Sequence, residues 1–568
     1  MGWDERARAW LQVDPDPDTR AELEDLLARG ADLAPRFAGR LEFGTAGLRG
    51  ELGAGPLRMN RVVVRQTTAG LAARLAQDGP PATTIVTVGR DARHKSDVFA
   101  ADVAGVLAQA GFDVRFWAAP VPTPLLAYAT RLLGAGAGVQ ITASHNPARD
   151  NGYKVYWRGG GQITPPLDGQ IAQAIAQTPT PVDVPAVAGR PLPDDIVDAY
   201  RAAVLELPPH PEERALGIVY TPLHGVAGAL AVDVLRRSGF GDVAVVDEQF
   251  APDPDFPTVA FPNPEEPGAL DAAMGLAARR DADLVLANDP DGDRVAAAVP
   301  TGAGWRLLTG DEIGSLLADY LLEQQPGGPE RVVATTVVSS QMLRRIAAAH
   351  DVGYTETLTG LKWLAAAADR AAAGGRRMVL AYEEALGVMI GDVVRDKDGI
   401  SAALVLADAA AFERARGRSL LDRLDDLARR FGVHAKAQTY VRYDPGADVA
   451  ADALARLRDR TPAEIAGTPV HAVDDHVAGV RRTTDGRATP LEVPRTDLVG
   501  LRLADGSRLQ IRPSGTEPKL KFYLEVVEPA GDDVAAARDR AQDRLAAVTD
   551  AFLDAAGIAD DLRAGMPA

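Results

Sequence analysis

Three aspartates at alternate positions carry the strongest chemical signal in this chain. Asp289, Asp291 and Asp293 occur in the segment Asp-Pro-Asp-Gly-Asp-Arg, directly after the apolar run 284–287. Carboxylates spaced in this way can turn inward together on one hard cation, and oxygen ligands suit Mg²⁺ or Ca²⁺. An EF-hand does not fit, because the twelfth position of the loop is Pro300 rather than a glutamate. The pattern favours Mg²⁺ completed by a phosphate oxygen over a solvated acidic turn, since aligned aspartates repel one another without a cation.

A serine on a short loop is the second candidate. Ser144 lies in the segment Thr-Ala-Ser-His-Asn-Pro, after the strand-like run 138–142. A serine hydroxyl is a weak nucleophile unless a base or a charge activates it, and His145 and Lys154 are close in sequence. The Gly-x-Ser-x-Gly elbow of hydrolases is absent here, so a hydrolase triad is not indicated. Taken alone, Ser144 could equally cap a helix while His145 packs.

Two loops have the composition of anion receptors. The run 512–519 combines an arginine, two hydroxyls and a glycine, so its guanidinium can bind phosphate bidentately while its turn amides form a nest. The glycine-rich run 43–50 carries Arg49 and permits close backbone approach to a ligand, which is a weak signal alone. A surface turn is the alternative for the run 512–519.

Sugar recognition is suggested by two further segments. Thr359 and Gly360 form a short turn between a strand-like run and a helix. Glu383 follows an apolar strand, where a carboxylate suits vicinal sugar hydroxyls that need acceptors, and Lys397 adds a cation downstream. For Glu383, a structural ion pair is an equal alternative.

Composition limits the classes of function. The chain has 568 residues, no cysteine and a formal net charge of −18. Disulfides and thiolate chemistry are excluded, and the acidic net charge argues against duplex nucleic acid as a partner, because phosphate binding needs a basic face. The start, MGWDERARAW, is not a secretory signal, and no apolar run reaches transmembrane length. A soluble cytoplasmic protein without a membrane partner is expected.

Short apolar runs alternate with amphipathic helices, which is the pattern of α/β domains. Proline-rich stretches divide the chain into four predicted units, and the last of them, with a strand-like run before a long helical stripe, is typical of an α+β domain. The predicted units are 1–206, 207–309, 310–437 and 438–568.

In this order, these segments resemble the α-D-phosphohexomutase superfamily, which includes phosphoglucomutase and phosphomannomutase. The resemblance extends from Phe43 to Lys519, and the TASHNP and DPDGDR segments are specific as a pair. The segments FGTAGLRG and YEEALG and the run 256–266 look like the larger branch of phosphoglucomutase-2-like enzymes and phosphopentomutases. The resemblance implies three related α/β domains with mixed sheets plus a C-terminal α+β domain, arranged around a central cleft.

The resemblance also implies roles for individual residues. Ser144 would be a phosphoserine and, with the three aspartates, a ligand of Mg²⁺. The residues implied to line the transfer site are Arg49, His145, Lys154, Arg294 and Lys397. Those implied to select the sugar are Thr359, Gly360 and Glu383. Those implied to hold the non-transferring phosphate are Arg512, Ser514, Gly515 and Thr516.

The implied reaction interconverts a sugar 1-phosphate and its terminal phosphate through a sugar 1,6-bisphosphate, which is both intermediate and activator. Either His145 or Lys154 would be the general base. Ala385 stands where phosphoglucomutases often have a serine, so phosphoglucomutase or phosphomannomutase activity is favoured but phosphopentomutase activity stays open. Two other readings are a Mg²⁺-dependent phosphatase with an aspartate nucleophile and an inactive sugar-phosphate sensor. A monomer or small homo-oligomer is expected.

Overall fold

The computed structural model describes residues 2–44, 46–185, 189–193, 195–444, 446–514, 518–563 and 566. The chain separates into two compact units, which are described in turn. The first comprises Met1–Gln325 and Leu361–Gly417, and the second comprises Pro326–Gly360 and Arg418–Ala568. Within the described residues, no helix has the length and apolar character needed to cross a bilayer.

The first sheet of the first unit is mixed, as predicted. Its strand order is β1-β5-β4-β2-β3-β6, in which β2 pairs in parallel with β3 and β4, whereas β5 runs antiparallel to β4 and β1. The strands are β1 (Leu48–Glu51), β2 (Ile85–Arg90), β3 (Asp113–Phe116), β4 (Ala137–Ile141), β5 (Asp150–Trp157) and β6 (Arg190–Pro191). The accompanying helices are α4 (Arg61–Leu75), η1 (Pro81–Thr83), α5 (Ser96–Gln109), α6 (Thr123–Leu132), α7 (Leu167–Gln177) and α8 (Asp195–Leu205). All five residues of β4 are buried, as expected for a central strand covered on both faces, and its one polar side chain, Gln140, donates to the Val121 carbonyl oxygen at 2.9 Å.

A second mixed sheet, with the order β11-β10-β9-β7-β8, follows. Its strands are β7 (Gly217–Thr221), β8 (Asp242–Val245), β9 (Leu284–Asn288), β10 (Val295–Thr301) and β11 (Gly304–Leu307). Its helices are α9 (Gly228–Arg237), α10 (Asp247–Phe250) and α11 (Asp271–Arg280). The strand β9 is fully buried and reverses into β10 through the predicted metal loop, so the sheet places that loop at one of its edges.

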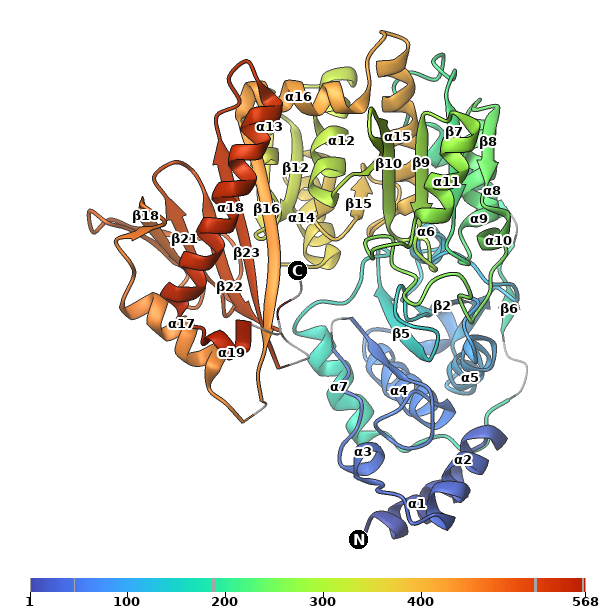
Figure 1. Ribbon diagram of the computed structural model, residues 1–568. Coiled ribbons are helices and arrows are strands. Elements are labelled where there is room, and N and C mark those ends of the chain that lie inside the picture. Colours follow the sequence, from blue (N-terminus) through green and yellow to red (C-terminus); the bar gives the residue numbers. More distant parts are fainter. Residues whose placement is uncertain are drawn as a thin grey trace. The chain divides into compact units, whose positions relative to one another are not determined.

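The rest of the first unit consists of an N-terminal helical segment and a group of later elements. The helices α1 (Trp3–Val13), α2 (Pro17–Ala28) and α3 (Ala34–Phe37) share a small apolar core and lie together (Figure 1). The later elements are α12 (Gly310–Gln324), α14 (Leu361–Ala373), β14 (Arg377–Glu383), β15 (Gly387–Ile390) and α15 (Gly399–Arg414). The strands β14 and β15 are antiparallel, and Glu383 and Gly387 form the last pair before the turn that joins them. Glu383 therefore lies at a strand end.

The second unit contains a parallel pair and an antiparallel sheet. The pair is β12 (Arg331–Thr336) and β13 (Gly353–Thr357), with α13 (Met342–Ala349) between them in sequence. The sheet has the order β16-β23-β22-β21-β18-β19-β20, with β17 paired to β18. Its strands are β16 (Val433–Arg442), β17 (Glu464–Ile465), β18 (Thr468–Asp475), β19 (Val480–Thr483), β20 (Ala488–Pro490), β21 (Val499–Leu503), β22 (Arg508–Pro513) and β23 (Lys519–Glu528). Its helices are α16 (Leu420–Phe431), α17 (Val449–Asp459), α18 (Val534–Ala556) and α19 (Asp560–Arg563).

The long helix α18 covers the C-terminal sheet next to β16 and β23 (Figure 1). The helical stripe predicted from the sequence is buried against this sheet, because Leu545, Val548 and Phe552 all belong to its core. An antiparallel sheet with helices on it confirms the predicted α+β class of this part of the chain.

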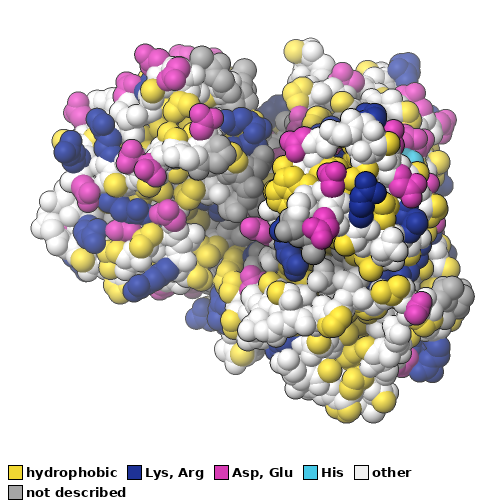
Figure 2. Space-filling view, turned by 90° about the horizontal axis from the view of Figure 1, so that it is seen from below, with side chains coloured by type: hydrophobic (Ala, Val, Ile, Leu, Met, Phe, Trp, Pro, Cys, Tyr) yellow, Lys and Arg dark blue, Asp and Glu magenta, His cyan; other side chains and the backbone are white. Residues whose placement is uncertain are grey.

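The molecular surface carries both signs of charge. On the face drawn in Figure 2, the described Lys and Arg side chains are interspersed with Asp and Glu and with apolar side chains. This face therefore offers no continuous basic field among its described atoms, which agrees with the overall acidic composition.

Candidate active site

The loop after β4 presents Ser144 in an uncommon conformation. Ser144 has a φ of 55°, in the left-handed region, and is only 2% exposed. Its backbone N–H donates to the Thr142 hydroxyl at 2.8 Å, which turns the chain sharply. A non-glycine residue in this region costs roughly 1–3 kcal/mol, so the surrounding contacts must hold the loop in place.

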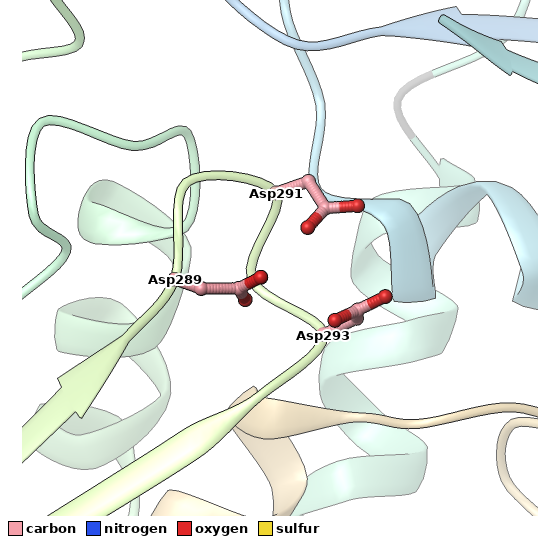
Figure 3. A group of neighbouring side chains, drawn as sticks. All are labelled: Asp289, Asp291 and Asp293. Atoms are coloured by element: carbon pink, nitrogen blue, oxygen red, sulfur yellow. The ribbon is translucent and has the colours of Figure 1, made fainter. Parts of the chain in front are cut away.

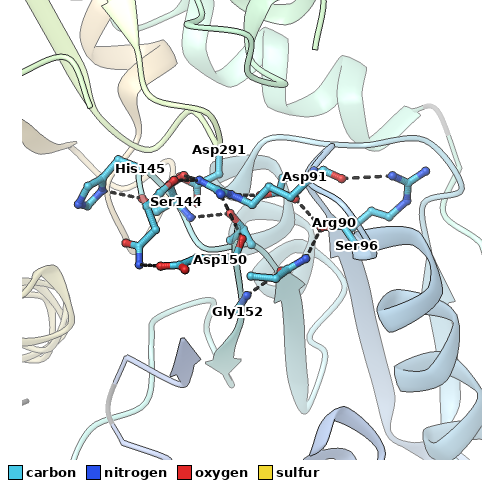
Figure 4. Close-up of polar contacts among 12 residues, drawn as sticks. Arg90, Asp91, Ser96, Ser144, His145, Asp150, Gly152 and Asp291 are labelled. Carbon is cyan, nitrogen blue, oxygen red and sulfur yellow. Dashed lines mark hydrogen bonds and ion pairs between the residues drawn. The ribbon is translucent and has the colours of Figure 1, made fainter. Parts of the chain in front are cut away.

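Arg93 provides those contacts, and sequence reasoning missed it. Its Nη2 donates to the carbonyl oxygens of Ser144 at 2.6 Å and Asn146 at 2.5 Å, and its Nη1 donates to that of Pro147 at 2.8 Å. Asp91 Oδ2 lies 3.3 Å from Arg93 Nε and forms an ion pair with the guanidinium. Figure 4 shows the polar contacts around Asp91 and Ser144. A sequence pattern that could have indicated this role is the charged pair Asp91 and Arg93, which follows β2. Because β2 and β4 are parallel neighbours, the segments after them lie at the same edge of the sheet.

The structure brings the predicted serine and metal loops together. Ser144 Oγ donates to Asp289 Oδ2 at 2.8 Å and lies 3.2 Å from His145 Nδ1. Thr123, at the start of α6, donates its hydroxyl proton to Asp291 Oδ2 at 2.6 Å. The two sheets of the first unit thus meet at a single polar site.

The three aspartates are fully buried, and their side chains project to the same side of the β9–β10 loop (Figure 3). One oxygen from each lies within 4.8 Å of the others. Asp291 Oδ1 and Asp293 Oδ1 are buried without a hydrogen-bond partner. Buried carboxylate oxygens are normally satisfied, so this pair, together with the oxygen-only donor set, fits a hard divalent cation. The loop requires Gly292 at a φ of 74°.

The protonation of the triad follows from its surroundings. Burial and the charges of Asp291 and Asp293 raise the pKa of Asp289 to about 8. Burial alone would also raise the pKa of Asp291, but Lys154 and the Thr123 hydroxyl hold that pKa below its ordinary value. These opposite shifts are what three buried carboxylates produce when a cation donates hydrogen bonds directly to only some of them, as the Lys154 ammonium does to Asp291 and Asp293.

Two lysines supply those cations. Lys154 on β5 donates from Nζ to Asp291 Oδ2 at 2.6 Å and to Asp293 Oδ2 at 2.8 Å. Lys397 Nζ lies 3.4 Å from Asp293 Oδ2. Burial opposes the charge of Lys154, but the two aspartates raise its pKa, so its ammonium stays protonated.

The remaining transfer-site candidates of the first unit surround the serine. Arg294 Nη2 lies 3.5 Å from His145 Nε2, and Arg49 Nη1 lies 3.5 Å from Asn146 Oδ1. Burial, followed by the charges of Arg294 and Arg49, lowers the pKa of His145 well below its usual value. His145 is therefore neutral at neutral pH.

Glu383 ends β14 close to this group. Burial raises its pKa to about 7, against the opposing charge of Lys397. The backbone of Gly387 lies close to the Lys397 side chain, since a Cβ on Gly387 would lie 2.4 Å from Lys397 Cδ. Arg294 forms a backbone bridge with Gly387, which joins the metal loop to the β14–β15 turn.

The second unit holds the predicted phosphate loop. The Arg512 side chain, at the end of β22, donates to the hydroxyl of Thr359, which precedes Gly360. Arg512 Nε is buried without a hydrogen-bond partner. The Ser514 N–H donates to the carbonyl oxygen of Lys519 at 2.8 Å, which closes the loop, and the predicted residues Gly515 and Thr516 lie outside the described residues. A guanidinium with an unsatisfied N–H suits an anion.

Four domain families match the chain in succession. They are the phosphoglucomutase/phosphomannomutase alpha/beta/alpha domains I, II and III, over residues 40–181, 198–302 and 309–431, and the C-terminal domain of the same enzymes over residues 464–543. The chain belongs to the phosphoglucomutase/phosphomannomutase family. The resemblance inferred from the sequence motifs is confirmed, whereas the residue limits of the four predicted units stay a prediction.

Several characterised or named proteins are similar over almost their whole length. A probable phosphoribomutase of Schizosaccharomyces pombe is 39% identical over 91% of this chain and 92% of its own. The phosphopentomutase of Mus musculus is 33% identical over 93% and 91%. The glucose 1,6-bisphosphate synthase of Homo sapiens is 33% identical over 96% and 93%.

Among solved structures, a phosphoglucomutase/phosphomannomutase family protein from Burkholderia thailandensis has a TM-score of 0.67 at 22% identity, covering 91% of this chain and 97% of that one. This similarity shows the shared fold. The family matches and the relatives above identify the chain as a phosphosugar mutase and leave the sugar unresolved.

Proposed function

We propose that this enzyme interconverts a pentose 1-phosphate and the corresponding 5-phosphate through a phosphorylated Ser144 and a bisphosphate intermediate. The sequence motifs alone favour phosphoglucomutase or phosphomannomutase activity, with phosphopentomutase activity as the alternative. Two observations now favour it. Relatives that match over nine-tenths of both chains are named phosphoribomutase and phosphopentomutase, and Ala385 removes a hydroxyl contact in the sugar loop.

The contact between Ser144 and Asp289 carries the mechanistic part of the proposal. The serine oxygen, buried beside a triad with two unsatisfied oxygens, is where a phosphoryl group and a cation would meet. The residues that would hold Mg²⁺ are Asp289, Asp291 and Asp293. When bound, Mg²⁺ would neutralise charge on the phosphoryl oxygens of the loose transition state.

The chain's own residues would carry out the transfer. The bond between phosphorus and Ser144 Oγ breaks as a bond from the sugar hydroxyl oxygen to phosphorus forms, and the hydroxyl proton passes to a base. His145 Nδ1 is within hydrogen-bond reach of Ser144 Oγ, whereas Lys154 is held between two aspartates. Of these two candidates, His145 is the better placed base, because its imidazole is neutral whereas the protonated Lys154 ammonium has no lone pair with which to accept a proton. Rotation of the bisphosphate then brings its second phosphate to Ser144. The other phosphate then returns to Ser144 by the same exchange.

A mutase assay tests this proposal. The purified chain, with Mg²⁺ and a trace of sugar bisphosphate, would be given ribose, deoxyribose, glucose and mannose 1-phosphates separately. We expect the pentose phosphates to give the highest kcat/KM, and Ser144→Ala to abolish conversion while thermal unfolding is unchanged. Faster conversion of glucose or mannose 1-phosphate would restore the hexose assignment. Release of free phosphate without isomerisation would support the phosphatase instead.

A further inference from the structure

Glu265, in the loop between α10 and α11, contacts the transfer site although neither the motifs nor the mechanism above gives it a role. It lies in the run Phe-Pro-Asn-Pro-Glu-Glu, residues 261–266. Its Oε2 is 3.2 Å from Arg294 Nη1, and the Glu265 side chain is 39% exposed, whereas that of Arg294 is 12% exposed. The carboxylate therefore approaches a nearly buried guanidinium from the solvent side.

Arg294 depends on this carboxylate because only its backbone is fixed by other groups. Its N–H donates to Asp289 Oδ1 at 3.0 Å, and its carbonyl oxygen accepts from Asn288 Nδ2 at 2.6 Å. The guanidinium has a long 3.5 Å contact with His145 Nε2, and its Nε is buried without a partner. An arginine side chain carries about 2 kcal/mol of rotamer entropy, so a single ion pair decides where its planar group rests.

The alternative resting place for the guanidinium is the triad itself. Asp289 and Asp293 both attract the charge of Arg294, as does Glu383. Without Glu265, the guanidinium is drawn toward two of the three carboxylates that suit a cation, where it would compete with that cation. It would also leave Nε2 of His145, the ring whose Nδ1 lies beside Ser144.

We propose that Glu265 is a positioning residue that holds the Arg294 guanidinium against His145 and away from the metal-binding aspartates. This inference rests on the role proposed above for the triad and Ser144. It predicts that loss of the Glu265 charge weakens cation binding as well as turnover, although Glu265 touches neither the cation site nor the serine.

The test uses the full chain and a matched control. Glu265→Gln and Glu265→Ala would be compared with Glu266→Gln, which removes the same charge from the next residue, an exposed one with no ion pair in the described structure. Calorimetric titration with Mg²⁺ gives a readout independent of activity. We expect about tenfold weaker Mg²⁺ binding and about tenfold lower kcat in the Glu265 variants, with KM changed less, and wild-type behaviour for Glu266→Gln.

Each outcome decides the question. Unchanged Mg²⁺ affinity and kcat in both Glu265 variants would overturn the proposal, as would equal damage from Glu266→Gln, since that would indicate a general effect of charge. If Glu265→Ala fails to fold, Glu265→Gln carries the comparison. If the wild-type chain proves inactive as a mutase but its Mg²⁺ binding still depends on Glu265, the proposed reaction fails and the positioning role stands.

Discussion

Ser144 Oγ lies 2.8 Å from Asp289 Oδ2, although the two residues are 145 positions apart in the sequence. The contact joins a loop of the first mixed sheet to a loop of the second. The proposed nucleophile and the proposed cation site are thereby held at hydrogen-bond distance by two packed sheets. This arrangement makes the reaction sensitive to any residue that positions either loop.

Asp291→Asn should remove Mg²⁺-dependent activity while leaving the fold intact. In the wild type, Thr123 and Lys154 donate hydrogen bonds to Asp291, and the amide oxygen of the variant can still accept them. The amide brings no negative charge to the cation. Changes in groups that merely support metal ligands cost about 10–100-fold in affinity, so loss of a ligand should cost at least about a hundredfold. Mg²⁺ titration of activity, with chelator-treated wild type as the reference, measures this. Normal Mg²⁺ activation in the variant would remove Asp291 from the site.

Arg93→Lys should reduce turnover sharply and also lower stability. A lysine keeps the charge but cannot reach several carbonyl oxygens at once in the fork geometry that holds the Ser144 loop. Release of the strained loop should cost roughly 2–4 kcal/mol, because buried Asp91 also loses its guanidinium neighbour and keeps the contacts from the Ser96 hydroxyl and the backbone N–H of residue 93. Thermal unfolding and kcat would be compared with Arg90→Lys, whose side chain bonds to carbonyl oxygens in a more exposed position. Equal effects of the two substitutions would contradict a special role for Arg93.

The apolar strands and the chemical loops could be predicted from the sequence because both are local patterns. The strand-like run 138–142 corresponds to β4 at Ala137–Ile141, and the triad follows β9 as predicted. Arg93 could not be predicted in the same way, because it binds backbone carbonyls, which leave no trace in residue types. The pairing of Lys154 with two aspartates was equally hidden, since it joins separate sheets.

Turnover at low substrate should rise with pH through about 7, the value to which burial raises the pKa of Glu383. The sign follows from the raised pKa: below about 7 the carboxyl is mostly protonated and accepts sugar hydroxyls poorly, and above it the carboxylate forms. KM should therefore fall as pH rises from about 6 to about 8. Glu383→Gln should have a higher KM without this change, and it corrects for titration of the substrate phosphate, whose second pKa is about 6. The same pH dependence in both proteins would assign the titration to the substrate.

Glu525 should make the second unit sensitive to acid. Its buried carboxylate accepts from His434 Nδ1 at 2.8 Å, Ser340 Oγ at 2.6 Å and the Gln341 N–H at 2.8 Å. Burial would raise its pKa, but His434 and Arg508 hold that pKa well below the ordinary value. A depressed folded-state pKa gives stability that is present above about pH 4.5 and is lost as pH falls toward the folded pKa.

Glu525→Gln should accordingly lower stability at neutral pH by roughly 3–5 kcal/mol, because it breaks the buried ion pair with Arg508, which then keeps Glu356 as its carboxylate partner. It should also flatten the loss of stability below about pH 4.5. Thermal unfolding from about pH 3 to 7 would be followed for the wild type, this variant and Glu528→Gln. Glu528 lies on the same strand but pairs with the exposed Arg540 at 3.0 Å, so its removal should cost about 1 kcal/mol or less. A Glu525→Gln protein as stable as Glu528→Gln, with an unchanged acid transition, would show that the buried carboxylate contributes no net stability to this unit.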